Sequence, residues 1–404
     1  MLLQRIRNTR VSVAELSGGV RVVWGVVSTG RIGVVDDGLF QMDLNLHPNE
    51  ASGLLVIEDG ALLEAHGWDL GFWAVLDEGE IEDCVAAIGH RRGSPQEEGW
   101  EIERLHASVT GDAGKTEDAE AITRDHTSGT VYILGSHFGS KSGPLQPKRG
   151  FVARFHEAEV GHVTEDPAMN LEIARRSFAL HRVINDAFDG HGIDLIPLGE
   201  QAHKALIDAT IKRGKKEGKK WTGLVHEDDY PINIEGAAFR QSGSLLLGLR
   251  FPTAANGRPL LVEIEGIDRL FEKDRLPEVL GFWTVDAVGK GGDIAGVRDL
   301  ALHTTQDGEE LHVVTGNVDS RDKQSVLVQD YPGGRETVAT HFRCAMPPDA
   351  HSGELKGAFV REFPNLPRVE GLAIADNDRA YYVTDEDEGV HLRLTRFLEG
   401  SART

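Results

Sequence analysis

The chain has 404 residues, of which 40% are hydrophobic, so it is long enough to bury a sizeable core. Its 65 acidic and 43 basic residues give a formal net charge of -22, which disfavours broad binding to nucleic acid or to an anionic membrane. The two cysteines, Cys84 and Cys344, exclude a disulfide scaffold, and they lack the spacing of a zinc site.

The N-terminal stretch argues against export. Arg5, Arg7 and Arg10 stand where the apolar core of a secretory signal would have to lie. No run of the sequence approaches the roughly 18 apolar residues of a membrane span. We therefore expect a soluble, cytoplasmic protein.

One short pattern occurs five times along the chain. An acid opens an apolar strand, a polar turn follows, and a second apolar strand ends in a polar residue. A third apolar run usually comes next, as in LGFWAVLDEG after the first acid and VHLRLTRF after the last. Repeated meanders of this kind predict an all-β fold, a β-propeller of four-stranded blades. The marker acids are 70, 115, 64 and 71 residues apart: Glu50, Glu120, Glu235, Asp299 and Glu370.

The number of blades depends on residues 1–48, which carry the strand-like runs GVRVVWGVVSTG and RIGVVDDGLFQMDL. Some of these strands must pair with the C-terminal ones and close the ring, because an open sheet edge invites association. The remainder could form a sixth, degenerate blade. We expect six blades first and five as the alternative, with residues 1–404 as a single propeller domain.

The long gap between the second and third markers has a different pattern. After Asp166-Pro167 the apolar residues recur at three- and four-residue steps, which predicts a helix, and a second helix follows that frays at Gly214. We expect residues 157–231 to form a helical insertion between two blades.

Four stretches, which begin at Asp118, Ile234, Gly296 and Val369, resemble in order an uncharacterised bacterial family of predicted β-propellers, a domain of unknown function. That family is distantly similar to the phytase-like esterase family. The resemblance covers most of residues 49–395. The resemblance implies the propeller fold but does not indicate which reaction the protein catalyses.

A second, weaker resemblance suggests which residues could bind a metal. In six-bladed propellers of the gluconolactonase type, the acid of a Glu-Gly pair at the start of an innermost strand is a metal ligand at the mouth of the channel. Glu235 and Glu370 stand in such a pair, whereas the other three markers do not. Those lactonases also use Asn and Asp ligands from other blades, for which Asn317 and Asp385 are plausible by position without matching the motif. The candidate metal ligands are then Glu50, Glu120, Glu235, Asp299, Glu370, Asn317 and Asp385.

The marker acids also suggest a reaction from their placement alone. The first strand of each blade lines the channel of a propeller, so five carboxylates would converge, and they cannot all stay ionised without a cation or basic partners. Ca²⁺ suits several oxygen ligands in loose geometry, and the chain has no zinc-type motif. A bound metal could polarise a carbonyl or phosphoryl oxygen. We therefore expect a metal-dependent hydrolase of esters, lactones or phosphoesters.

Polar residues follow the second strand of each repeat, 15 to 18 residues beyond the marker: His66, His137, Arg250, Asn317 and Asp385. His137 is the candidate general base, because the pKa of histidine lies nearest neutrality. Arg250 is the candidate for binding a substrate carboxylate or phosphate, with His66 and with Lys141 of a Gly-rich loop as further substrate-binding candidates.

Two alternatives stand beside this hypothesis. The acids could accept backbone N–H bonds from neighbouring blades, with Arg250 neutralising one of them. The protein could also be a non-catalytic propeller that binds a protein partner through its rim, its insertion or a basic segment. Cations at a helix C-terminus also fit a solvated helix end, and nucleic acid would bind, if at all, only there. The basic segment comprises Lys212, Arg213, Lys215, Lys216, Lys219 and Lys220.

Overall fold

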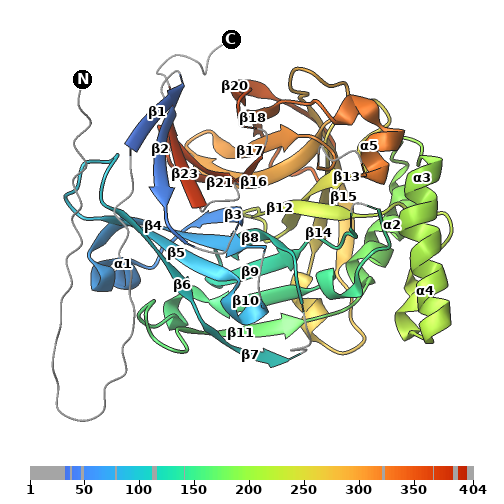
Figure 1. Ribbon diagram of the computed structural model, residues 1–404, viewed down its shortest axis with the longest axis horizontal. Coiled ribbons are helices and arrows are strands. Elements are labelled where there is room, and N and C mark those ends of the chain that lie inside the picture. Colours follow the sequence, from blue (N-terminus) through green and yellow to red (C-terminus); the bar gives the residue numbers. More distant parts are fainter. Residues whose placement is uncertain are drawn as a thin grey trace.

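The computed structural model describes residues 32–36, 39–46, 50–77, 80–111, 116–140, 142–320, 324–366, 368–384 and 390–397. In this part of the chain the strands form five sheets, which surround a common centre as a β-propeller (Figure 1). Six blades, our first expectation, is therefore corrected to five.

The first two blades precede the helical insertion. Strand β7 follows the last strand of blade 1 along the chain but joins blade 2 by a parallel pairing with β11. Blade 1 contains β3 (Ala51–Val56), β4 (Trp68–Leu76), β5 (Val85–Arg91) and β6 (Trp100–Leu105). Blade 2 contains β8 (Ala119–Asp125), β9 (Thr130–Gly135), β10 (Val152–His156), β11 (Met169–Ala174) and β7 (Ala107–Gly111).

The remaining blades follow the insertion, except for strands β1 and β2 of blade 5, which come from the start of the chain. Blade 3 contains β12 (Asn233–Phe239), β13 (Leu245–Phe251), β14 (Leu260–Glu265), β15 (Glu278–Asp286) and β19 (Gly353–Lys356). Blade 4 contains β16 (Gly296–Thr305), β17 (Gly308–Gly316), β18 (Ala339–Ala345) and β20 (Ala358–Phe363). Blade 5 contains β21 (Val369–Asp376), β22 (Arg379–Thr384), β23 (Val390–Arg396), β2 (Leu39–Leu44) and β1 (Ile32–Asp36).

The pairing of β2 explains why there is no sixth sheet in the described residues. β2 pairs antiparallel with β23, so β1 and β2 become the outer strands of blade 5 and close the ring there. The Arg393 guanidinium also donates a hydrogen bond of 2.5 Å to the side-chain carbonyl of Gln41 across this seam. The run GVRVVWGVVSTG lies outside the described residues.

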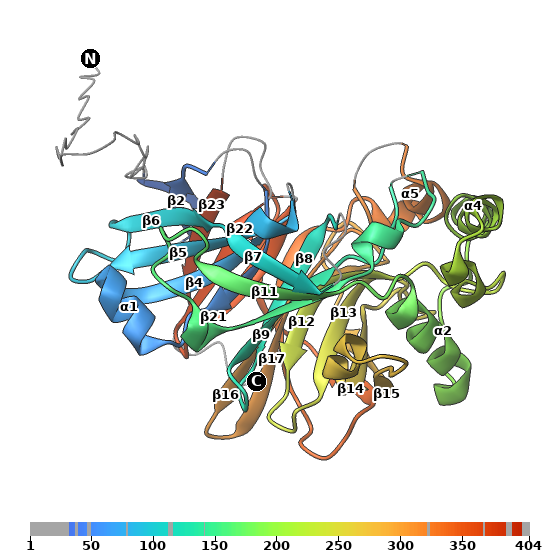
Figure 2. The ribbon, with the colours of Figure 1, turned by 90° about the horizontal axis from the view of Figure 1, so that it is seen from below.

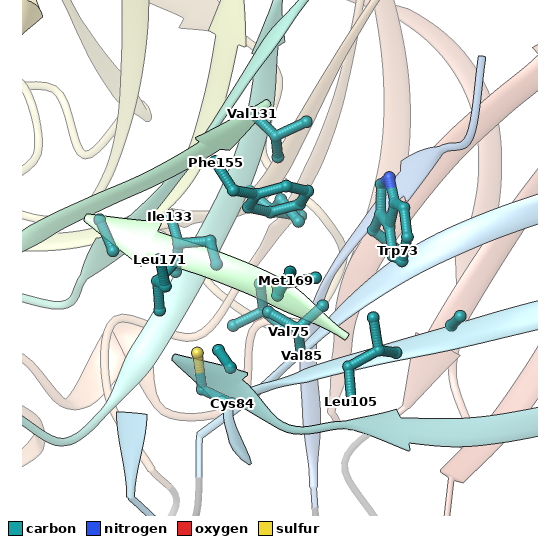
Figure 3. Close-up of a cluster of buried hydrophobic side chains, with 14 of the residues drawn as sticks. Trp73, Val75, Cys84, Val85, Leu105, Val131, Ile133, Phe155, Met169 and Leu171 are labelled. Atoms are coloured by element: carbon teal, nitrogen blue, oxygen red, sulfur yellow. The ribbon is translucent and has the colours of Figure 1, made fainter. Parts of the chain in front are cut away.

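Apolar side chains fill the space between neighbouring sheets. Figure 3 shows the contact of blades 1 and 2, where residues of β4, β5 and β6 meet residues of β9, β10 and β11. Trp73 is fully buried there, and its ring packs edge-on against Phe155 at a centroid distance of 5.7 Å. Each sheet thus buries its faces against its neighbours, as the repeated meanders required.

The first repeat contains a helix that its sequence pattern did not reveal. Helix α1 (Gly60–His66) lies between β3 and β4, with the Asp59 carboxylate capping its first turn and Gly67 at a φ of 68° ending it. The run LGFWAVLDEG is consequently part of the second strand of blade 1 and not of the third.

The insertion begins later than expected. Leu171 and Ile173 belong to β11, which pairs with β10 and β7, so the first part of residues 157–231 completes blade 2. Helix α2 (Ala179–His191) starts after Phe178, which adopts a φ of 64°. The short α3 (Glu200–Ala202), a π-helical stretch over 203–208, and α4 (Ala209–Glu217) follow.

The second helix of the insertion does not fray at Gly214. Gly214 is buried inside α4, where an added Cβ would lie 2.7 Å from the Trp221 ring, and the helix ends at Gly218 with a φ of 62°. The insertion helices and α5 (Val326–Asp330) gather at one side of the ring in both Figure 1 and Figure 2. None of the helices in the described residues is both long enough and apolar enough to cross a membrane.

Candidate functional site in the central cavity

The innermost strand of every blade carries a β-bulge at the same position. In each, one residue is left out of the register between the first and second strands. These bulged residues form a ring at one end of the channel: Ser52, Glu120, Glu235, Arg298 and Glu370. Three of them are marker acids, and in blade 4 the equivalent residue is an arginine.

Asp299 is one residue past the bulge and has a different role from the other markers. Its carboxylate accepts hydrogen bonds of 2.7 Å from the Leu300 amide and 2.6 Å from the Leu372 amide of blade 5. It is 1% exposed and does not line the cavity, and burial raises its pKa well above the ordinary value. Asp299 therefore fastens two blades together, as in the structural alternative for the markers.

A cavity of about 980 Å³ opens above this ring. Seven carboxylate side chains and three arginines line it: Glu50, Asp77, Asp118, Glu120, Glu235, Asp319, Glu370, Arg149, Arg250 and Arg368. Hydroxyl and amide groups complete the wall: Ser136, Ser140, Ser142, Ser320, Asn233, Asn317 and Gln324. Four of the five marker acids thus reach one cavity.

Two arginines neutralise the acids of blades 3 and 5. Arg298, 2% exposed, forms an ion pair with Glu370 and places Nη1 3.5 Å from Oε2 of Glu235. Arg250 donates from Nη1 to Oε1 of Glu235 at 2.9 Å and from its other nitrogens to the carbonyl groups of Asn317. Glu235 and Glu370 therefore have the basic partners that their burial demands.

The acids of blades 1 and 2 have a different environment. Burial raises the pKa of Glu120 well above its ordinary value, and the charges of Glu235, Asp118 and Asp77 raise it further. Burial also raises the pKa of Asp118, although the Arg149 guanidinium and the Ser136 hydroxyl act in the opposite direction. Within the described residues no hydrogen bond or ion pair involves the side chain of Glu120. Glu120 is thus a half-buried carboxyl group whose pKa is raised by its surroundings.

The predicted residues at the ends of the second strands divide into two groups. Arg250 and Asn317 line the cavity, and they contact each other. His66 does not, because α1 lengthens the first hairpin and places His66 on the helix, next to His162 and Trp68. The residue that follows the second strand of blade 1 is Asp77, which does line the cavity.

His137 also lies away from the cavity. The preceding residue, Ser136, takes the cavity position, and His137 is buried, with Nδ1 2.8 Å from the carbonyl oxygen of Gly135. Burial lowers the pKa of His137 to about 4. The geometry therefore gives no support to His137 as a general base facing a substrate. Lys141 and Asp385 lie outside the described residues.

The helical insertion supports one wall of the cavity. Phe138, which lines it, packs in a cluster with Phe178, Leu206 and Ile211 of the insertion. The amide of Leu145 in the same loop donates a hydrogen bond of 2.9 Å to the hydroxyl of Thr210. The insertion thus supports Phe138 and Leu145 beside the cavity.

At the cavity, the described residues contain no group of three His, Cys, Asp or Glu side chains whose ligand atoms all lie within 4.8 Å of one another. The His226, Asp228 and Asp229 group meets that distance, but it lies at the end of the insertion, and Asp229 is paired with His181 and Arg182. The cavity acids thus form no compact cluster of three carboxylates by themselves.

Sequence reasoning missed Arg298, Asp77, Asp118 and Arg149. One feature of the sequence could have identified the ring residues: each bulged residue is followed by a residue with a short side chain. In blades 1 to 5 the two residues are Ser-Gly, Glu-Ala, Glu-Gly, Arg-Asp and Glu-Gly. Alignment on that second residue would have placed Arg298 in the ring and shifted the first repeat by two residues, from Glu50 to Ser52.

The basic segment lies on α4 and the turn after it. Its lysines are exposed, whereas Arg213 is half-buried and donates hydrogen bonds to Gln146 at 3.0 Å and to Glu217 at 3.2 Å. The segment is therefore largely a solvent-facing surface beside the cavity-wall loop.

Comparison with known proteins gives distant structural likenesses only. No family model and no curated protein matches the sequence. A mannose phosphorylase from Leishmania mexicana is 10% identical, with 92% of this chain and 90% of that one covered and a TM-score of 0.37. A levansucrase mutant from B. megaterium is 9% identical, with 87% and 84% covered and a TM-score of 0.40. An exo-1,5-α-L-arabinanase from a bovine ruminal metagenomic library is 10% identical, with 86% and 93% covered and a TM-score of 0.35. The propeller assignment rests on the five sheets of this chain.

Proposed function

We propose that the protein is a hydrolase that acts in the central cavity, with Glu120 as general acid and Glu235 as general base. The observation that carries the proposal is the contrast between the two carboxyl groups. Glu120 has a strongly raised pKa and no partner among the described residues, whereas Glu235 is held by two arginines. Paired carboxyl groups with opposite environments are typical of acid and base roles.

The proposed reaction splits a C–O bond of an ester, lactone or glycosidic linkage with one water molecule. Glu120 donates its proton to the leaving oxygen as that bond breaks. The carboxylate of Glu235 removes a proton from the attacking water, whose oxygen forms the new bond to carbon. The products are an acid or hemiacetal and an alcohol, and exchange of protons with solvent restores both glutamates.

The test is a chromogenic panel of 4-nitrophenyl esters, 4-nitrophenyl glycosides and, with a pH indicator, lactones. We expect turnover of one class, and we expect Glu120→Gln and Glu235→Gln each to lower kcat by about 10²-fold or more. Glu278→Gln, an exposed acid at the start of β15, is the matched control. A folded protein that turns over none of these substrates, or an activity that survives both substitutions, would contradict the proposal.

The calcium hypothesis becomes a narrower proposal. A cation would bind between the cavity acids of blades 1 and 2, which are Glu50, Asp77, Asp118 and Glu120. Its charge would lower the pKa of Glu120 and remove the proton donor. Calcium titration of chelator-treated protein distinguishes the two mechanisms. A metal-dependent hydrolase should become more active as Ca²⁺ is added. With general acid catalysis by Glu120, the activity should stay unchanged or fall.

A second candidate function is partner binding through the basic segment. The observation in its favour is the exposure of five lysines on α4 and the following turn, in a chain of net charge -22. Reversal of Lys215, Lys216 and Lys219 to Glu should release any acidic partner retained from a lysate of the source cells at low salt. Retention of the same partners by the reversed variant would end this idea.

A further inference from the structure

We infer that the cavity binds an uncharged, hydroxyl-rich ligand, of the size of a small oligosaccharide, and rejects phosphorylated or carboxylated molecules. The inference deepens the proposed function, because it concerns the same cavity. Its volume of about 980 Å³ is at the upper end for a small-molecule site, which leaves room for more than one ring.

The charges of the wall argue against an anionic ligand. Seven carboxylates face three arginines, and the arginines are already engaged. Arg250 uses Nε, Nη1 and Nη2 on Asn317 and Glu235. Arg149 donates to Asp118 at 2.8 Å and to the Gly139 carbonyl at 3.3 Å, and Arg368 also interacts within the fold. An incoming phosphate or carboxylate would meet desolvated negative charge without a free guanidinium.

The wall contains a buried acceptor, Oδ1 of Asn233, that a hydrogen-bond donor of the ligand could satisfy. Asn233 is 3% exposed and lines the cavity, and its Nδ2 donates to Oε1 of Glu235 at 3.2 Å. That bond fixes the amide, so Oδ1 points the other way, and within the described residues no donor reaches it. A buried carbonyl oxygen without a partner costs free energy that a ligand hydroxyl would recover. An anionic oxygen in the same place would be repelled.

The mixture of acceptors and donors in the wall separates a neutral ligand from a cationic one. An ammonium group supplies donors only, so it would leave the donors of the wall without partners. Hydroxyls supply both donors for the carboxylates and acceptors for the serine and amide groups of the wall, such as Ser136, Ser140 and Gln324.

The test is binding of the labelled protein to a glycan array that carries neutral, sialylated, sulfated, phosphorylated and amino-sugar glycans, followed by calorimetry on the strongest hits. We expect binding to be confined to neutral glycans and to weaken roughly tenfold in Asn233→Ala. Asn256→Ala, an exposed amide in a turn of blade 3, is the matched control and should bind as the parent does.

Glu120→Gln keeps the size of the side chain and removes its acidic proton, so it should bind neutral glycans without turnover. Preference for charged glycans, binding to none, or identical binding by Asn233→Ala would overturn the inference. Binding of neutral glycans without any hydrolysis would leave the inference standing and contradict the proposed function. Hydrolysis of an anionic substrate would support the proposed function and contradict the inference.

Discussion

Arg298 is the residue that links three blades at the centre of the ring. It is 2% exposed, and its guanidinium is paired with Glu235 of blade 3 and with Glu370 of blade 5. Its removal would leave two buried carboxylates with less compensation. We predict that Arg298→Met lowers the free energy of unfolding by about 3–5 kcal/mol, as measured by urea denaturation at pH 7.

Two further variants make this prediction specific. Arg275→Ala removes an exposed pair with Glu272 and should cost less than about 1 kcal/mol. Arg298→Met combined with Glu370→Gln should recover part of the loss, because one of the stranded charges is gone. An Arg298→Met protein as stable as the parent would show that the central ion pairs do not stabilise the ring.

The raised pKa of Glu120 has a consequence for stability. Between its ordinary pKa of 4.5 and its folded-state pKa, the folded protein keeps a proton that the unfolded chain has released. The contribution of Glu120 to stability is therefore fully present below 4.5 and is lost as the pH rises through the folded-state pKa. We predict that the difference in Tm between Glu120→Gln and the parent shifts in favour of the variant as the pH is raised from 4.5 towards neutrality.

The measurement is a series of thermal melts across that pH range for Glu120→Gln, the parent and Glu278→Gln. Differences between variants are informative because other carboxyls with raised pKa, such as Asp299, change the parent and the variants alike. A constant offset between Glu120→Gln and the parent at every pH would show that Glu120 is not protonated in the fold.

The sequence located the acids of the cavity better than their partners. The repeat placed Glu120, Glu235 and Glu370 at one end of the channel because their spacing follows the blades. It could not reveal Arg298, because Arg298 and Asp299 are adjacent and the repeat pattern does not show which of them lies in the ring. The structure places Arg298 there, whereas Asp299 accepts hydrogen bonds from backbone amides. His137 failed for the same reason, because side chains alternate and Ser136 takes the inward position.

At the scale of the element, the glycine after a bulge sets how closely two inner strands approach. A Cβ on Gly236 would lie 2.8 Å from the amide nitrogen of Leu300 and 3.0 Å from the backbone of Asp299, both in β16. The backbone there cannot yield without moving a blade. We predict that Gly236→Ala destabilises the protein by about 1–3 kcal/mol in urea denaturation.

Gly60→Ala is the matched control for this change. Gly60 opens α1, and an added Cβ there meets nothing within 4 Å. Alanine should be neutral or stabilise by up to about 1 kcal/mol, because it restricts the unfolded chain and favours the helix. Equal effects of the two substitutions would contradict the role assigned to close strand packing.

Individual elements were predictable where the pattern was long and ambiguous where it was short. The helical periodicity after Asp166 included Leu171 and Ile173, yet these residues form β11, because a short apolar run fits a strand as well as a helix. Pairing with β10 and β7 decides between them, and such pairing is a tertiary effect. Likewise, α1 interrupts the first hairpin and moves the cavity position from His66 to Asp77.

At the scale of the whole molecule, the ring closes through strands from the two ends of the chain. β2 pairs with β23, although their residues are about 350 positions apart, as the hydrogen bond between Gln41 and Arg393 shows. A sequence pattern carries no signal for such a distant pairing, so the choice between a sixth blade and a completed fifth blade stayed open until the structure resolved it.

This closure suggests that damage to the seam is felt beyond blade 5. Met42 of β2 is 2% exposed and packs in a cluster that joins blades 5 and 1, with Leu54, Phe72 and Tyr381 among its members. Met42→Asp would bury an unpaired carboxylate there. We predict a loss of about 3–5 kcal/mol in a single unfolding transition, since each blade is stabilised by two neighbours.

Hydrogen-exchange mass spectrometry on the same variant locates the effect. Protection should fall first in β21, β22 and β23 and in the adjoining β3 and β4, while β13 and β14 across the ring stay protected until global unfolding. Asn45→Asp adds a carboxylate at an exposed position just after β2; it is the control and should leave this pattern unchanged. If Met42→Asp lost protection only in β2, the N-terminal strands would be an appendage of blade 5, and the ring would hold without them.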